Sequence, residues 1–271
     1  MHKGKRPEHA ALITGASAGI GEELAKRFAA DGYDLVLVAR DRARLEKVGE
    51  ELKAKHGVRY HAIAADLSDT AAPEQVLQAV RRTGVQVEAL VNNAGFGLYG
   101  PFVKTEHGEA TEMRRELEMI QVNVTALTHL TKLFLPEMVQ RGRGRVLNVA
   151  STAAFQPGPL MAVYYASKAY VLSFGEALAV ELRGTGVTVT TLCPGATRTE
   201  FQKAAAMEDS RLFNTPLVMT AEEVAEVGYR AMQRGKGVVI PGAANNVMAQ
   251  AVRFVPRKLA ARLALMAQQR V

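Results

Sequence analysis

Short apolar runs alternate with longer amphipathic segments along most of this chain, and this alternation constrains its fold more than any other feature. Each link from one parallel strand to the next needs a crossover, usually a helix. The pattern therefore predicts an α/β fold, a doubly wound and mostly parallel sheet with helices on both faces. The predicted strands are Ala10–Ile13, Asp34–Ala39, Val58–Ala65, Val87–Val91, about Arg145–Val149, Val187–Leu192 and Gly237–Ile240.

The chain length and the apolar content suit a single large domain. With 271 residues, 48% of them hydrophobic, the chain can bury a substantial core. No apolar run approaches the ~18 residues of a spanning helix, and the basic start at Met1–Arg6 precedes too short an apolar run for a signal sequence. Cys193 is the single cysteine, without metal-ligand spacing around it. We expect a cytoplasmic protein with no metal.

The positive charge lies at the C-terminal end. The formal net charge is +7, yet Gly228–Val271 has eight basic residues and no acidic one, so the rest is nearly neutral. This distribution gives no reason to expect nucleic-acid binding over the whole surface. We divide the chain into a domain at residues 1–242 and a basic amphipathic C-terminal extension at residues 243–271.

Apolar residues of the extension recur at helical spacing. Pro256 interrupts the pattern, so one continuous stripe is not predicted. This apolar face either closes a pocket or packs against a subunit, or it forms an interfacial helix that makes peripheral contact with an anionic membrane. The apolar positions are Val247, Met248, Ala251, Val252, Val255 and Leu259, followed by Leu263 and Met266.

A glycine-rich turn, Thr14–Gly21, joins the first predicted strand to an amphipathic helix that ends near Ala30. Glycines at positions 15, 19 and 21 permit a tight turn and let a pyrophosphate approach the backbone N–H groups at the helix N-terminus. The strand-to-helix context favours a dinucleotide site over a random glycine cluster.

Two further strand ends add polar residues. Ala39 and Arg40 follow the second strand, where an acid would bind the ribose diol of NAD and a base suits the 2′-phosphate of NADP, so we predict NADP. In the alternative, Arg40 is only a solvent-exposed residue at the end of the strand and does not contact the cofactor. Asp66 follows the third strand. Either it lies at the carboxyl edge of the sheet, where ligands bind, or Asp66 or Ser68 is the N-cap of the next helix.

Amide side chains follow the fourth strand and recur in the next helical region. Asn92 and Asn93 precede Ala94-Gly95 and can cross-link neighbouring strand ends beside a cofactor. Asn123 lies among apolar residues within a helical region at about Thr105–Gln140 that has probable breaks. It must be buried and hydrogen-bonded, so it either caps a kink or holds a water for proton relay, and the sequence favours the structural role.

Tyr164 and Lys168 are one helical turn apart and project from the same helix face. A phenol titrates near ~10, and a neighbouring ammonium lowers its pKa toward the range of a usable general acid or base. Tyr165 lacks this partner, because its i+4 residue is Ala169.

Five motifs occur in order: Thr-Gly-x-x-x-Gly-x-Gly, Asn-Asn-Ala-Gly, an upstream serine, Tyr-x-x-x-Lys and Pro-Gly-x-x-x-Thr at Pro194–Thr199. Through them the chain resembles the classical short-chain dehydrogenase/reductase family over about residues 8–242. The resemblance implies a Rossmann-like fold and hydride transfer between a nicotinamide and a carbonyl or secondary alcohol.

The same resemblance implies roles for individual residues. Tyr164 is the expected acid/base, Ser151 the hydroxyl that polarises the substrate oxygen, and Lys168 the cation that binds ribose and lowers the pKa of Tyr164. Asn123 falls where the family keeps its relay asparagine. Ser151 precedes Tyr164 by thirteen residues, the family's usual spacing, which makes Ser167 the poorer candidate.

The expected cofactor contacts follow in the same way. Asp66 and Asn93 flank the adenosine side, and Thr199 approaches the nicotinamide carboxamide. Ala18 replaces a second base that many NADP-binding members have, so the predicted preference for NADP over NAD rests on Arg40. The residues expected to border the pyrophosphate are Gly15, Ser17, Gly19, Ile20 and Gly21.

The loops at the carboxyl edge predict an apolar pocket for a lipid-like, steroid-like or xenobiotic ketone or aldehyde. The resemblance also implies a homodimer or homotetramer that pairs through the helices after strands four and five. Two alternative functions are a catalytically silent NADP-binding regulator and a membrane-surface scaffold. The predicted pocket residues are Phe96, Leu98, Tyr99, Phe155, Leu160, Met161, Phe201, Leu212 and Phe213.

Overall fold

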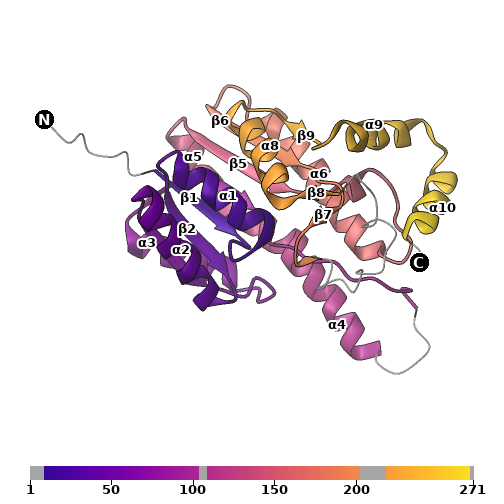
Figure 1. The fold of residues 1–271 in the computed structure, drawn as a ribbon, viewed down its shortest axis with the longest axis horizontal. Helices are drawn as coiled ribbons and strands as arrows, with labels where there is room; N and C mark the ends of the chain where they lie inside the picture. The colour runs from indigo at the N-terminus through magenta and orange to yellow at the C-terminus, as the bar shows by residue number, and fades with distance from the viewer. Residues whose placement is uncertain (1–8, 104–108, 202–217, 269–271) are drawn as a thin grey trace, which may run out of the picture.

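The computed structural model of the protein describes residues 9–103, 109–201 and 218–268. These residues form a seven-stranded sheet in the order β3-β2-β1-β4-β5-β6-β9 (Figure 1), and every neighbouring pair is parallel. The predicted α/β fold with a doubly wound sheet is thus confirmed. The strands are β1 (His9–Thr14), β2 (Asp34–Ala39), β3 (Tyr60–Ala64), β4 (Gln86–Asn92), β5 (Gly144–Val149), β6 (Val187–Leu192) and β9 (Val238–Val239).

Helices cover both faces of the sheet. Alternate strand residues point to opposite faces, which gives two separate apolar cores. Helices α1, α2 and α8 pack on one face, and α3, α5 and α6 on the other. The helices are α1 (Gly19–Ala30), α2 (Arg42–His56), α3 (Ala72–Thr83), α4 (Glu109–Ile120), α5 (Leu127–Gln140), α6 (Ala162–Glu181), α8 (Ala221–Gln233), α9 (Ala243–Ala251) and α10 (Arg257–Gln268).

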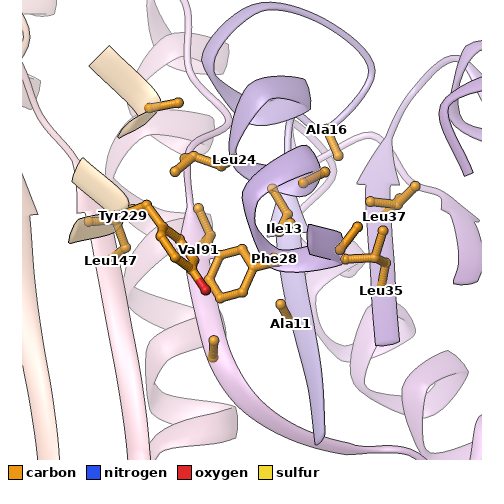
Figure 2. Close-up of a cluster of buried hydrophobic side chains, with 14 of the residues drawn as sticks. Ala11, Ile13, Ala16, Leu24, Phe28, Leu35, Leu37, Val91, Leu147 and Tyr229 are labelled. Atoms are coloured by element: carbon orange, nitrogen blue, oxygen red, sulfur yellow. The ribbon is translucent and has the colours of Figure 1, made fainter. Parts of the chain in front are cut away.

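Aromatic rings join α1 and α8 above the middle of the sheet. The ring of Phe28 is fully buried and meets Tyr229 edge to face at a centroid distance of 4.9 Å (Figure 2). It packs over Ile13 and Val91 of the two central strands. Such edge-to-face pairs add about 0.5–1.5 kcal/mol to the stabilisation from buried area. The contact holds α1, and with it the glycine-rich turn, against the sheet.

The strand order reverses between β1 and β4. From β1 the chain moves outward to β2 and β3, and it then returns to β4 on the other side of β1. In such sheets a crevice opens at the carboxyl ends of the strands at this switch point, and ligands bind there. The turn after β1 and the Asn92–Gly95 segment after β4 both lie at this crevice.

The structure corrects several predicted boundaries. Strand β3 begins at Tyr60 instead of Val58, and β9 has only two residues. A small parallel pair, β7 (Thr197–Arg198) with β8 (Met219–Thr220), was not predicted. The break expected near Asn123 is a π-helical segment, Gln121–Ala126, between α4 and α5.

The chain after β9 forms two helices. Helix α9 is followed by a 3₁₀ turn at Val252–Phe254, and Pro256 separates this turn from α10, as the interruption in the apolar pattern indicated. No helix among the described residues is both long and apolar enough to span a membrane.

Candidate active site

Ser151 and Tyr164 are brought together by β5 and α6. Ser151 lies just past the end of β5 and caps the 3₁₀ helix Thr152–Phe155, because its Oγ accepts the N–H of Ala153 at 3.1 Å. Tyr164 lies in the first turn of α6, with the side chain of Ser151 beside its phenol. Burial raises the pKa of Tyr164, and the nearby hydroxyl of Ser151 offsets this only in part. The two hydroxyl groups converge on one point.

Lys168 lies one turn further along α6 and is buried. Its Nζ donates to the carbonyl oxygen of Val149 at 2.9 Å and lies 5.8 Å from the ring centroid of Tyr164. Burial lowers the pKa of Lys168 to about 8, against a weaker opposing effect of Cys193. Burial dominates at the phenol of Tyr164 and the ammonium of Lys168 donates to a carbonyl, so a pKa-lowering effect of Lys168 on Tyr164 stays a prediction.

Asn123 projects from the π-helical segment and is almost fully buried. Its side chain accepts the N–H of Phe96 at 3.1 Å and donates to the carbonyl oxygen of Phe96 and to the Oγ of Ser167, each at 3.0 Å. The Oγ of Ser167 in turn donates to the main-chain oxygen of Tyr164 at 2.7 Å. Asn123 therefore ties the loop after β4 to the helix of Tyr164, in line with the structural role that the sequence favoured.

The two amides at the end of β4, Asn92 in the strand and Asn93 after it, cross-link strand ends as predicted. Asn92 Nδ2 donates to Asn148 Oδ1 on β5 at 2.9 Å, and Asn93 Nδ2 donates to the carbonyl oxygen of Thr14 on β1 at 2.9 Å. The main-chain N–H of Asn93 also donates to Thr14 Oγ1 at 3.0 Å. These bonds hold the edge of the crevice between β1 and β4 in one geometry.

The glycine-rich turn fits a pyrophosphate. Gly15 has φ +65°, and a Cβ there would lie 2.8 Å from Asn93 Nδ2, so only glycine suits this position. Gly19 has φ +59° and faces Thr199 in the same way. The N-cap of α1 is Ala18, which has no side-chain acceptor for the first N–H groups of the helix. A bound anion can supply the acceptor that these N–H groups lack.

Arg40 and Asp66 lie at the ends of β2 and β3. Burial alone would raise the pKa of Asp66, but hydrogen bonds from Ser68 and the nearby charge of Arg40 lower it. The carboxylate of Asp66 accepts both the N–H and the Oγ of Ser68, at 3.0 and 2.8 Å. The alternative of an N-cap at Asp66 or Ser68 is wrong, because α3 begins only at Ala72.

One cavity of about 820 Å³ joins the glycine-rich turn to the Ser151–Tyr164 pair. Four of the predicted site residues do not line it: Asn123, Ser17, Gly21 and Asp66. The predicted residues that line it are Gly15, Gly19, Ile20, Arg40, Asn93, Ser151, Tyr164, Lys168 and Thr199.

The sequence and this arrangement match a known family. A family model described as short chain dehydrogenase matches residues 9–210, which include the turn, the amide pair and the Ser-Tyr-Lys set. The chain belongs to the short-chain dehydrogenase family. It is therefore an oxidoreductase that acts on alcohol or carbonyl groups with NAD(P).

Individual relatives of this short-chain dehydrogenase differ in their substrates. It is 38% identical over 220 residues to a sulfoacetaldehyde reductase of Chromohalobacter salexigens, covering 79% of this chain and 84% of the relative. A short-chain dehydrogenase from Sphingobium yanoikuyae in complex with NADPH matches with a TM-score of 0.77 and 35% identity, over 93% and 98% of the two chains. A bulky-bulky ketone specific alcohol dehydrogenase from Comamonas testosteroni matches with a TM-score of 0.74 and 32% identity, over 90% and 92%.

The substrate side of the dehydrogenase cavity is apolar. Phe96, Phe155, Met161 and Phe201 line it, as the sequence predicted. Three other predicted residues lie elsewhere and line a separate cavity of about 340 Å³, which Met161 also borders: Leu98, Tyr99 and Leu160. Leu212 and Phe213 lie outside the described residues.

The C-terminal helices form the far wall of this cavity. The structure thus agrees with the alternative in which the C-terminal extension closes a pocket. The helical spacing of apolar residues on either side of Pro256 indicated this role in the sequence. None of these residues was among the predicted pocket residues, because they are distant from every motif. The wall consists of Asn245, Met248, Ala249, Ala251, Val252, Val255, Leu263, Ala264 and Ala267.

Gln268 connects α10 to helix α6 of the dehydrogenase. Its buried Nε2 donates to the hydroxyl of Tyr165 at 2.6 Å, and its main-chain oxygen accepts the hydroxyl of Tyr99 at 3.0 Å. Tyr165 neighbours Tyr164, and the two rings meet edge to face at 6.1 Å. The position of α10 is thus tied to the helix that presents the acid/base candidate.

Tyr165→Phe is expected to lower the free energy of unfolding by about 1–3 kcal/mol, because the buried amide of Gln268 loses its acceptor. Urea unfolding measures the change. Tyr170→Phe on the same helix is the control, since its hydroxyl bonds Thr128 at the exposed surface. Adding Gln268→Leu to Tyr165→Phe should restore most of the loss, because both polar partners are then gone. An unchanged unfolding midpoint for Tyr165→Phe would show that the hydrogen bond between Gln268 and Tyr165 does not stabilise the protein.

Proposed function

We propose that this short-chain dehydrogenase uses NADPH to interconvert bulky hydrophobic ketones or aldehydes and the corresponding alcohols. The observation that supports this most is the shared cavity: residues of the glycine-rich turn, Ser151, Tyr164, Lys168 and many apolar side chains all line it. A silent NADP-binding regulator would need the turn alone. The three reacting side chains in one cavity favour an enzyme.

The proposed chemistry assigns one task to each side chain. NADPH, when bound, supplies the hydride for the carbonyl carbon. Tyr164 donates its phenolic proton to the substrate oxygen, and the Oγ of Ser151 donates a hydrogen bond to the charge that develops there. The ammonium of Lys168 lies close enough to bind ribose hydroxyls and to stabilise the phenolate that Tyr164 becomes. Asn123 holds the loop at Phe96 and helix α6 together, which keeps the two hydroxyl groups aligned.

The cofactor-binding residues follow from the same arrangement. We propose that Gly15, Ser17, Gly19, Ile20 and Gly21 surround the pyrophosphate, that Asp66 and Asn93 flank the adenosine, and that Thr199 meets the nicotinamide carboxamide. Support comes from the uncapped start of α1 and from the close approach of Gly15 to Asn93 and of Gly19 to Thr199.

Charge in the cavity bears on the substrate class. Sulfoacetaldehyde, the substrate in the name of one relative, is a small anion, and a buried sulfonate needs a cation or several donors. Among the described residues that line the cavity, Arg40 and Lys168 are the cations, and both belong to the proposed cofactor side. The apolar remainder instead suits a bulky ketone, the substrate in the name of another relative.

NADPH consumption by the purified protein tests this proposal. The panel consists of aryl and branched ketones, small aliphatic aldehydes and sulfoacetaldehyde. We expect the highest kcat/KM for the bulky ketones and loss of turnover in Tyr164→Phe. Preference for sulfoacetaldehyde would overturn the substrate class, and NADPH binding without turnover of any carbonyl would favour the regulator.

Arg40→Asp should reverse the cofactor preference. Arg40 is exposed at the end of β2, where its charge can meet the 2′-phosphate, and a carboxylate there would repel that group. We expect the Kd for NADPH to rise about 10- to 100-fold, as loss of a charge-assisted bond of about 1.5–3 kcal/mol implies, and the Kd for NADH to fall. Fluorescence titration measures both constants. Arg42→Asp, two residues on, is the matched control, and equal affinities in the unmutated protein would refute the preference.

We also propose that the dehydrogenase forms a homodimer or tetramer through α4 and α6, which pack against one another. Leu117→Arg should convert it to a monomer, because it buries a charge in the interface. Light scattering at micromolar concentration measures the mass, and Ala54→Arg on exposed α2 is the control. A monomeric unmutated protein would contradict the proposal. The apolar residues exposed on the two helices are Met113, Leu117, Ile120, Tyr170 and Val180.

A further inference from the structure

The C-terminal helices have an apolar outer surface. Figure 1 shows α9 and α10 at one end of the molecule, beyond the edge of the sheet. Phe254, in the turn between them, is 89% exposed. We call this surface the tail face, and its exposed apolar residues are Val247, Met248, Phe254, Leu259, Leu263 and Met266.

Helix α10 is apolar on two sides. Ala260, Ala264 and Gln268 recur at intervals of four and are buried against the protein. Leu259, Leu263 and Met266 recur at i, i+4 and i+7, and each is about half exposed. Leu259 and Met266 do not line the cavity, and each stays about half exposed, so packing among the described residues does not account for the outer stripe.

The tail face is also strongly basic. Arg253, Arg257, Lys258 and Arg262 are exposed beside the apolar residues. The chain from Gly228 to Val271 has no acidic residue that could neutralise them. An apolar stripe with flanking cations is the composition of helices that lie in the plane of an anionic lipid surface.

The tail face adjoins the cavity. Met248 and Leu263 line the cavity, and about half of each side chain is exposed to solvent. The same two residues therefore belong to the inner wall and to the outer surface. A partner that covers the tail face would cover this side of the cavity as well.

We propose that the tail face docks on an anionic lipid surface, with α9 and α10 lying in the interface and the cavity wall turned toward the lipid. A second copy of the chain is the poorer occupant, because a twofold interface sets the same patch against itself. Four cations would then meet four cations with no acid in the tail to pair with them. Docking does not depend on the proposed function, whereas uptake of an apolar substrate from the lipid does.

Co-sedimentation of the full-length protein with lipid vesicles tests the docking. One set contains phosphatidylcholine alone, and the other contains equal parts of phosphatidylcholine and phosphatidylglycerol. We expect binding to the anionic set at low salt and little binding to the neutral set. High salt should weaken the binding, because the charges are screened.

Two variants separate the apolar and the electrostatic contributions. The triple substitution Phe254→Ser, Leu259→Ser and Met266→Ser, and the combined change of the four cations to Gln, should each lower the partition coefficient at least about tenfold. Val139→Ser on α5 and Arg183→Gln after α6 are the matched controls and should bind as the unmutated protein does. All variants should keep their activity on a water-soluble ketone without vesicles, because none of these residues lines the cavity.

Three results would overturn the docking. The unmutated protein stays in solution with anionic vesicles at low salt, or the triple variant binds them as well as the unmutated protein does. The third result has two parts: the unmutated protein binds no vesicles, and the triple substitution changes the oligomeric mass measured without vesicles. The tail face would then be a contact between copies of the chain. Turnover of the soluble ketone is measured separately, so failure of the proposed function is distinguishable.

Discussion

Tyr164→Phe is expected to lower kcat about 10²- to 10⁴-fold, the usual contribution of a general acid, and to leave the Kd for NADPH unchanged. The phenylalanine ring keeps the packing of Tyr164 against Phe201, whose ring centroid lies 5.4 Å away, but it has no proton to deliver. Steady-state kinetics with the best ketone of the panel and a fluorescence titration of NADPH measure the two quantities.

Tyr165 supplies the control for this prediction. It also lines the cavity, but its hydroxyl is held by Gln268. Tyr165→Phe should therefore retain most of the kcat, whatever it does to stability. Substantial turnover in Tyr164→Phe together with a large loss in Tyr165→Phe would mean that the second tyrosine is the acid.

Lys168→Met should abolish most turnover, weaken NADPH binding and yet stabilise the folded protein without cofactor. Burial lowers the pKa of Lys168 to about 8, so the folded state disfavours the charged ammonium at neutral pH. Methionine fills a similar volume without a charge. After allowance for the lost bond to the Val149 carbonyl, we expect the free energy of unfolding at pH 7 to rise by about 1–3 kcal/mol.

The pH dependence of stability gives this prediction a second readout. With an ordinary pKa of 10.5 and a folded value of about 8, Lys168 holds fewer protons in the folded state than in the unfolded state between these two values. Stability therefore rises with pH across that window, and below pH 8 the full burial penalty remains. The difference between the Met variant and the unmutated protein should shrink as the pH rises from 8 to 10.5.

Urea unfolding of both proteins without cofactor, at several pH values, measures the difference. Ser167→Ala on the same helix is the control, since it removes a buried polar group that does not titrate. A constant difference between pH 7 and pH 10 would show that Lys168 is not held in a destabilised charged form. Full activity of the Met variant would remove Lys168 from the proposed mechanism.

The arrangement of the strands and the position of the turn could be predicted from the sequence, because both depend on local signals. The buried strand Asp34–Ala39 is a continuous apolar run after its first residue, and its end places Arg40 at the carboxyl edge of the sheet, where ligands bind. The start of β3 does not follow from such a local signal. Tyr60, and not Val58, is the first residue that pairs with β2, and pairing is decided by the neighbouring strand.

The residues of the pocket wall could be predicted only in part, because a loop has no periodicity that sets the direction of its side chains. Leu160 has φ +65°, and its carbonyl oxygen accepts the N–H of Gly100 at 2.8 Å. This contact joins the two loops, and Leu98, Tyr99 and Leu160 line the smaller cavity beside it. The bond between Gln268 and Tyr165 spans 103 positions, and neither residue belongs to a motif.

The cavity wall is divided along the chain in a way that bears on how relatives diverge. The side chains proposed to react lie between Ser151 and Lys168, whereas the opposite wall lies after Gly242, and a single connection after β9 joins it to the sheet. Mutations in this last segment can reshape the accepted substrate while the proton-transfer groups stay intact. Recombination at Gly242 would then exchange this wall as a unit, while Phe96, Phe155, Met161 and Phe201 would stay with the groups proposed to react.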